Sequence, residues 1–117
     1  MKYVMVLFVG ALATVMSVQA AGYRVETVAS GLDHPWSLAF LPDGRMLVTE
    51  RPGRLRLIEP GPDGRPQLRP AAVAGVPVVL ARGQAGLFDV VVDPAFAVNG
   101  HVLLSFAHGS PEANHLR

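Results

Sequence analysis

The sequence contains no cysteine, which excludes a disulfide framework, thiolate chemistry and a cysteine-ligated metal site. This absence does not argue against the periplasm, where disulfides are permitted but not required. An excess of basic charge is missing too, because nine basic residues balance nine acidic ones once Lys2 is set aside. We therefore expect no nucleic acid partner and no electrostatic attachment to an anionic membrane.

The start of the chain has the features of an export signal. Lys2 supplies a positive charge, residues 4–18 form an apolar run, and residues 18–20 (Val-Gln-Ala) form a small-residue cleavage site. We therefore predict that residues 1–20 are a helical signal peptide. Residues 21–117 would then form the mature protein, the N-terminal portion of a β-propeller as argued below.

A retained membrane anchor is the alternative for the same segment. Residues 3–21 carry no charge and approach the roughly 20 residues that a spanning helix needs. Ser17 and Gln19 weaken the end of such a span and fit a cleavage region better. We expect cleavage after Ala20 and a periplasmic or secreted product, with no retained anchor.

The rest of the chain also lacks a convincing helical period. The full chain has ten prolines and twelve glycines, and nearly all of them separate short apolar runs in this part, which indicates many short strands rather than helices. The predicted strands cover residues 23–29, 36–41, 46–50, 54–57, 87–92 and 101–106. The strand at residues 87–92 is rich in β-branched residues and is expected to have little water on either face.

Other segments are less regular. Residues 54–57 alternate arginine and leucine, as in an outer strand with one face in water. Residues 60–70 are predicted to form a loop. Residues 72–80, broken by Pro77, should form an edge strand or an irregular connection. Residues 109–117 are polar, and we expect no strand partner for them.

An internal repeat relates the two halves of this strand series. Residues 36–42 recur as residues 88–94 at a spacing of 52, and residues 46–49 recur as residues 102–105 at a spacing of 56. A period near 50 residues with about four strands per unit is typical of β-propeller blades. The alternative is a coincidence between two ordinary hairpins.

The repeat also brings a polar loop into focus. Gly83 and Gly86 give the loop unusual backbone freedom, and Gln84 between them carries both donors and an acceptor, which suits a hydroxylated ligand. Gln84 aligns with Leu32, so residues 33–34 should open on the same rim of the propeller channel, where small ligands commonly bind. The alternative is that the Gln84 amide satisfies loop backbone.

The histidines give weaker signals. His34 precedes a proline in a turn, which is more typical of a solvated or capping residue than of a ligand contact. His101, His108 and His115 recur every seventh residue, a spacing that places them on no common face of strands and loops. We therefore predict no metal site within this chain.

Turn chemistry and core packing account for the remaining candidates. Four aspartates adjoin glycine, proline or histidine in turns and are better explained as solvated turn residues than as calcium ligands: Asp33, Asp43, Asp63 and Asp93. Trp36, at the start of an inner strand, is expected to be a core residue.

Four motifs in a fixed order point to a known family. The segment GLDHPWSLAFLPDG at residues 31–44 is followed by MLVTERPGRL at 46–55, VAGVP at 73–77 and GQAGLFDV at 83–90. Together they resemble the soluble aldose and glucose dehydrogenases that depend on pyrroloquinoline quinone (PQQ), the glucose/sorbosone dehydrogenase family. The resemblance runs through nearly all of residues 21–117, which makes it far more specific than one glycine loop.

The resemblance implies an all-β fold, a six-bladed β-propeller with PQQ across the top of its channel and calcium beside the quinone oxygens. Such an oxidoreductase converts aldoses to lactones at C1. A histidine accepts the hydroxyl proton while hydride passes to PQQ, and an external electron acceptor reoxidises the cofactor. The resemblance carries over Gln84 as a sugar contact, not as a catalyst.

Two substitutions and the length of the chain depart from the family pattern. Ala85 stands where the family usually has glycine or asparagine, and Ala95 stands where an acidic residue commonly precedes phenylalanine. The sequence ends at Arg117, about two blades into the propeller, before the segments in which the family places its catalytic histidine, its calcium ligands and most PQQ contacts. We therefore assign no catalytic residue here. A non-catalytic binding or scaffold module, or an inactive remnant, is the alternative.

Overall fold

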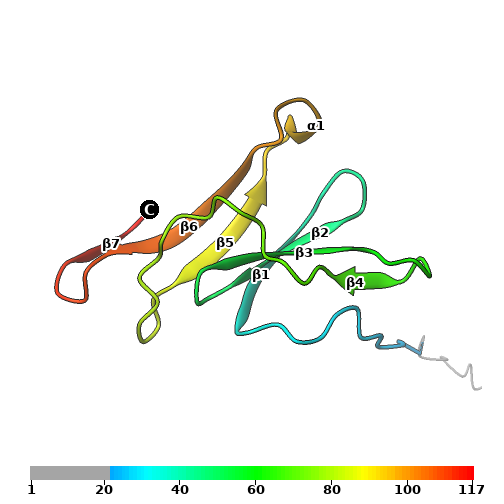
Figure 1. The fold of residues 1–117 in the computed structure, drawn as a ribbon, viewed down its shortest axis with the longest axis horizontal. Coiled ribbons are helices and arrows are strands. Elements are labelled where there is room, and N and C mark those ends of the chain that lie inside the picture. The colour runs from blue at the N-terminus through cyan, green and yellow to red at the C-terminus, as the bar shows by residue number, and fades with distance from the viewer. Residues whose placement is uncertain (1–21) are drawn as a thin grey trace, which may run out of the picture.

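Strands account for nearly all regular structure in residues 22–117, the part of the chain that the computed structural model describes (Figure 1). The elements are β1 (Pro35–Phe40), β2 (Met46–Glu50), β3 (Arg54–Pro60), β4 (Pro66–Leu68), β5 (Leu87–Val92), α1 (Phe96–Asn99), β6 (Val102–Gly109) and β7 (Asn114–Leu116). The predicted all-β fold class is confirmed. The signal peptide predicted for residues 1–20 lies outside the described residues.

Two antiparallel sheets make up the fold, with strand orders β1-β2-β3-β4 and β5-β6-β7. Each sheet is a series of hairpins between neighbours in sequence. β1 and β2 both contact β5, so the sheets lie against each other along their first strands (Figure 1). This arrangement is that of two neighbouring β-propeller blades.

The two sheets repeat the same strand register. Leu38 pairs with Val48 in the first sheet, and Val90 pairs with Leu104 at the equivalent place in the second. A register shift precedes Leu38 in β1 and precedes Val90 in β5. The spacings of 52 and 56 residues seen in the sequence therefore reflect repeated structure rather than a coincidence between hairpins.

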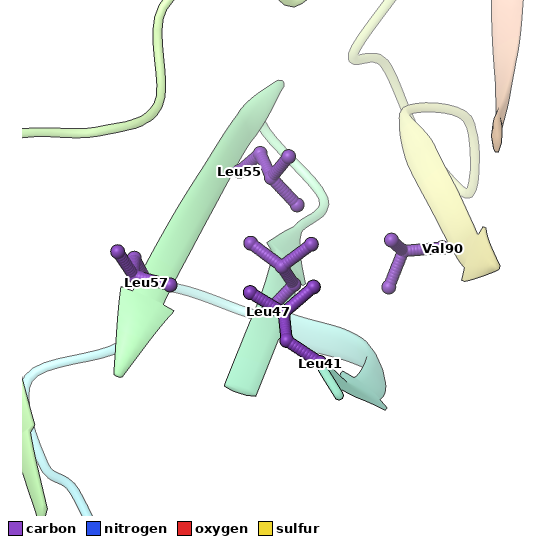
Figure 2. Packing of buried hydrophobic residues seen from close by; sticks show 5 residues of the cluster. All are labelled: Leu41, Leu47, Leu55, Leu57 and Val90. Carbon is purple, nitrogen blue, oxygen red and sulfur yellow. The ribbon is translucent and has the colours of Figure 1, made fainter. Parts of the chain in front are cut away.

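The core lies between the sheets. Leu41, directly after β1, forms a buried cluster with Leu47, Leu55 and Leu57 of the first sheet and Val90 of β5 (Figure 2). Partly buried residues packed against this cluster are Ala39, Val73, Val76, Val92, Phe96, Val102 and Leu104. Burial of each leucine side chain contributes about 1.5–3 kcal/mol. Each sheet therefore shields one apolar face of the other sheet from water.

Two segments that we predicted to lack strand structure form short strands. β4 lies within the loop predicted for residues 60–70, and β7 lies within residues 109–117, where no partner was expected. Each is three residues long, too short for apolar alternation to signal it. The backbone groups of β3 and β6 decide these pairings, and β3 is consequently an interior strand rather than an outer one.

Other predicted segments are also corrected. Residues 23–29 form no strand; Tyr23 and Val25 are 95% and 94% exposed, since no strand of the described residues pairs with them. Residues 72–80, by contrast, form the irregular connection that was one of the two predicted outcomes. The turn predicted at residues 95–100 contains the single-turn helix α1, closed by Gly100 in the left-handed conformation.

The strand β5 has one wet face, contrary to our expectation. Asp89 and Val91 are exposed, because nothing in the described residues covers the side of β5 that points away from the first sheet.

The helix α1 has four residues, and no helix in residues 22–117 is long and apolar enough to cross a membrane.

Candidate functional site

The loops that precede β1 and β5 meet on one rim of the paired blades. A hollow of about 380 Å³ lies there, lined by His34, Pro35, Trp36, Arg51 and Gln84. The repeat predicted that these two loops share a face, and the structure brings His34 and Gln84 into one hollow. The role of Gln84 as a sugar contact stays a prediction.

Arg51, directly after β2, is hydrogen-bonded to both loops of the hollow. Its backbone N–H donates to the carbonyl of His34 at 3.0 Å, and its own carbonyl accepts from the N–H of Leu87 at 2.9 Å. Its guanidinium donates to the carbonyl of Gly83. The Gln84 loop is therefore held by the first blade rather than only by its own strand.

Thr49 connects the inner strands beneath the hollow. Its hydroxyl is buried, donates to the carbonyl of Phe88 at 2.5 Å and accepts from the N–H of Ser37 at 3.0 Å. Trp36 packs against Phe88 with ring centroids 5.2 Å apart. Trp36 is nevertheless 54% exposed, so our expectation of a core residue is wrong: its second face has no cover within the described residues.

Gly86 is required because the backbone of Arg51 approaches it closely. A Cβ at this position would overlap the carbonyl oxygen and Cγ of Arg51. That carbonyl cannot move without losing its hydrogen bond from Leu87. We expect Gly86→Ala to lower the free energy of unfolding of the full-length protein by about 2–4 kcal/mol, measured by urea denaturation.

Gly83→Ala is the matched control for that prediction. Gly83 also has a positive φ, 58°, but a Cβ there meets open space. Only conformational strain of about 1 kcal/mol should then result. An equal decrease in the free energy of unfolding for the two variants would show that the close contact between Gly86 and Arg51 does not affect stability.

The substitution at position 85 causes no backbone strain. Among the described residues other than glycine, only His34 has a positive φ. Ala85 therefore needs no glycine-like freedom, and its N–H donates to the carbonyl of Arg82 at 2.9 Å. The departure from the family pattern at this position leaves the loop conformation intact.

Glu50 is a fully buried carboxylate beside the hollow. Oε1 accepts from the N–H of Asp33 at 2.8 Å and from Nη1 of Arg56 at 3.1 Å, and Oε2 accepts from Nε of Arg54 at 2.5 Å. Burial raises the pKa of Glu50, but the Asp33 N–H and the two arginines outweigh burial and hold the pKa below its ordinary value. Glu50 is therefore ionised, and its carboxylate holds Asp33, Arg54 and Arg56 in place through these hydrogen bonds.

Asp33 extends this ionic network to the rim. Its Oδ1 lies 2.5 Å from Nδ1 of His34, and its Oδ2 accepts from Nη2 of Arg54 at 3.1 Å. The hydrogen bond with His34 and the charge of Arg54 lower the pKa of Asp33. Glu50 and Asp33 in turn raise the pKa of Arg54, chiefly through the hydrogen bond to Glu50. Asp33 is therefore not the simple solvated turn residue that we predicted.

The other three turn aspartates behave as predicted. Asp43, Asp63 and Asp93 each accept a hydrogen bond from the backbone N–H two residues later, at 3.0, 3.0 and 2.7 Å. This bond is the usual device by which aspartate stabilises a turn. The hydrogen bond from the backbone of Arg45 also lowers the pKa of Asp43.

Two of the C-terminal histidines share a face after all. His108 of β6 pairs directly with His115 of β7, and their rings lie 5.6 Å apart. The expectation of no common face failed for this pair because it assumed that residues 109–117 have no strand partner. Residues 22–117 contain no group of three or more histidine, aspartate or glutamate side chains placed to hold a metal ion.

Sequence reasoning missed Glu50 as a structural centre. Its signal was nevertheless present: a tight turn places residue 50 opposite residue 54, and the alternation of Arg54 and Arg56 puts both on one face. A glutamate across the hairpin from two such arginines predicts a charge cluster. Its complete burial could not be inferred from that pattern.

Comparisons with known proteins agree with this architecture. The model of the Glucose / Sorbosone dehydrogenase family matches residues 32–117. The aldose sugar dehydrogenase YliI of Escherichia coli is 46% identical over 88 residues, which cover 74% of this chain and 22% of that protein.

Solved structures show the same relation. The crystal structure of the soluble aldose sugar dehydrogenase from Escherichia coli in its apo form matches with 44% identity and a TM-score of 0.68, over 78% of this chain and 25% of that one. The PQQ-bound aldose sugar dehydrogenase from Streptomyces coelicolor matches with 31% identity and a TM-score of 0.61, over 79% of this chain and 26% of that one. The chain thus spans about a quarter of the length of the relatives it matches.

Proposed function

The chain belongs to the glucose/sorbosone dehydrogenase family, and on this premise we propose that it is the N-terminal part of an exported, PQQ-dependent sugar dehydrogenase with a six-bladed propeller. The full-length enzyme would oxidise aldoses at C1 to lactones and pass the electrons to an external acceptor. The observation that carries this proposal is the rim hollow, in which Gln84 and His34 arrive from equivalent loops of two blades.

The residues described here fit the sugar side of such a site. The amide of Gln84 can donate to one sugar hydroxyl and accept from another. The indole of Trp36 gives the hollow an apolar wall, and Arg51 fixes the positions of both loops. These groups bind and orient the substrate rather than transform it.

The redox centre itself is proposed to lie in other segments of the full-length protein. Among residues 22–117, no three histidine, aspartate or glutamate side chains are grouped so that they could hold a metal ion. PQQ, when bound, supplies the hydride acceptor for the reaction. This chain is therefore proposed to contribute residues that bind the substrate. Hydrogen bonds and ion pairs of Glu50, and hydrogen bonds of Arg51, hold the loops that carry these residues.

Replacement of Gln84 tests this assignment in the full-length protein supplied with PQQ and calcium. We expect Gln84→Ala to raise the apparent KM for D-glucose about fivefold to tenfold and to change kcat little, because the lost hydrogen bonds act in substrate binding. The assay is sugar-dependent reduction of a dye. Gln67→Ala, an exposed amide in β4, is the matched control and should leave KM unchanged.

Two results would contradict the proposal. If no aldose supports dye reduction by the wild-type protein, the dehydrogenase assignment is wrong. If Gln84→Ala and Gln67→Ala give the same KM as wild type, the enzyme assignment stands, but the hollow is not the sugar site.

Export is a separate part of the proposal. We expect the mature protein to begin at Ala21 and to be released into the periplasm or medium, because residues 18–20 suit signal peptidase. N-terminal sequencing of protein recovered from those fractions checks this. A membrane-bound product that retains Met1 would instead indicate an uncleaved anchor.

A further inference from the structure

The proposed function leaves the histidine of the hollow without a role. His34 lines the hollow together with Gln84, and both side chains come from loops that the blade repeat places at equivalent positions. The sequence pattern alone is more typical of a solvated or capping residue at His34. Three observations in the structure argue for a more specific role.

The first observation is that one ring nitrogen of His34 is already engaged. Nδ1 lies 2.5 Å from Oδ1 of Asp33. The pKa of Asp33 is lowered by this hydrogen bond and by Arg54, so Asp33 is an ionised carboxylate that can only accept a hydrogen bond. Nδ1 therefore carries the proton, and in the neutral ring Nε2 is left as a hydrogen bond acceptor.

The second observation is the backbone conformation. His34 is the only residue other than glycine with a positive φ, 49°, among residues 22–117. A conformation of this kind is unfavourable by about 1–3 kcal/mol and persists only where the surroundings impose it. Strain held at a loop that lines a hollow favours a positioned side chain over a freely solvated one.

The third observation is that hydrogen bonds fix the backbone on both sides of the His34 side chain. The N–H of Asp33 donates to Glu50, which is fully buried, and the carbonyl of His34 accepts from the N–H of Arg51 at 3.0 Å. Arg54 joins Glu50 to the carboxylate of Asp33. The network therefore fixes the backbone of His34 and, through Asp33, the orientation of its ring.

We propose that His34 is a second sugar-contacting residue of the hollow, whose Nε2 accepts a hydrogen bond from a substrate hydroxyl while Asp33, anchored by Glu50 and Arg54, positions the ring. This inference rests on the proposed function, since it takes the ligand to be an aldose. No proton is transferred in this role. Nε2 of His34 selects a ligand group that donates a hydrogen bond, such as a sugar hydroxyl. The amide of Gln84 beside it can either donate or accept.

Two amide substitutions at position 34 separate this role from a structural one. Asparagine tolerates positive φ and places its amide near the position of Nδ1, so His34→Asn should keep the loop and lose the group at Nε2. Glutamine is longer and can place its amide oxygen near the position of Nε2. In the full-length protein we expect His34→Asn to raise the apparent KM for D-glucose about threefold to tenfold without changing kcat, and His34→Gln to recover most of this loss.

The positioning role of Asp33 is tested in the same assay. Asparagine at position 33 can donate as well as accept, so Asp33→Asn no longer dictates which ring nitrogen carries the proton. We expect this variant to raise KM by a smaller factor than His34→Asn. In the His34→Asn background it should add nothing further, since Asp33 acts through the ring.

Saturation-transfer NMR with D-glucose provides a readout that does not depend on turnover. Weaker glucose binding by His34→Asn than by His34→Gln supports the inference, even if the wild-type protein oxidises no aldose and the proposed function fails. Equal glucose affinity and equal KM for the wild-type protein and both variants would overturn it while leaving the dehydrogenase assignment intact. Absence of binding of every aldose tested, D-glucose included, to the wild-type protein would overturn both.

Discussion

Replacing Glu50 by alanine is expected to lower the free energy of unfolding of the full-length protein by about 3–5 kcal/mol. Glu50 is completely buried, and its carboxylate is the shared partner of Arg54 and Arg56. Only 11% of the Arg56 side chain is exposed, and its Nε has no hydrogen bond partner among residues 22–117. Without Glu50, Arg56 would be left as a buried charge with no countercharge.

Urea denaturation measures this effect, and Glu59→Ala is its matched control. Glu59 pairs with Arg69 at 3.0 Å on the surface, where both side chains reach water. An exposed pair of this kind contributes about 0–1 kcal/mol. A loss for Glu50→Ala as small as that for Glu59→Ala would mean that the buried network does not stabilise the fold.

The same network makes an acid-sensitive contribution to stability. The pKa of Glu50 lies below its ordinary value of 4.5 in the folded protein, so folding favours the ionised form. This contribution is therefore complete above about pH 4.5 and is lost as the pH falls through the lowered pKa. We expect the stability difference between wild type and Glu50→Gln to shrink as the pH falls below that point. A pH-independent difference would contradict this account.

Residues 21–117 expressed alone are expected to be unfolded or aggregated rather than a stable monomer. At least about three repeats are normally needed for stability in such architectures, because one blade cannot bury both faces. Leu38 and Phe40 of β1 are 49% and 68% exposed. Their equivalents in the second sheet, Val90 and Val92, pack into the core between the sheets.

The second sheet has a complementary bare face. Val91 and Leu103 pair across β5 and β6 and are both exposed, although their equivalents in the first sheet, Ala39 and Leu47, face the core. An apolar face is thus open on each sheet of the two-blade unit. Faces of this kind, together with unpaired strand edges, promote association.

Size-exclusion chromatography and thermal unfolding test this prediction, with the full-length protein as the control. We expect the isolated segment to elute as aggregate or to unfold without cooperativity, and the full-length protein to show a sharp transition. A monomeric segment with a sharp, cooperative thermal transition would show that two blades suffice.

The sequence by itself determined the short apolar strands that turn residues bound. The bounds predicted for β2 and β5 agree with the structure, and those for β1 differ by one residue at each end. The repeat placed Gln84 and His34 on one rim because equivalent positions in neighbouring blades must share a face. The family followed from four motifs whose order, rather than any single one, is specific.

The tertiary structure decided everything that depends on a distant partner. β4 and β7 are strands because an adjacent strand offers unpaired backbone groups, whereas residues 23–29 alternate well but pair with nothing in the described part of the chain. Trp36 is half exposed because burial requires a neighbouring sheet, which no local pattern can supply. Glu50 reaches Asp33, 17 residues away, only after the hairpin has closed. Local alternation sets which face a side chain occupies, but long-range packing sets what that face meets.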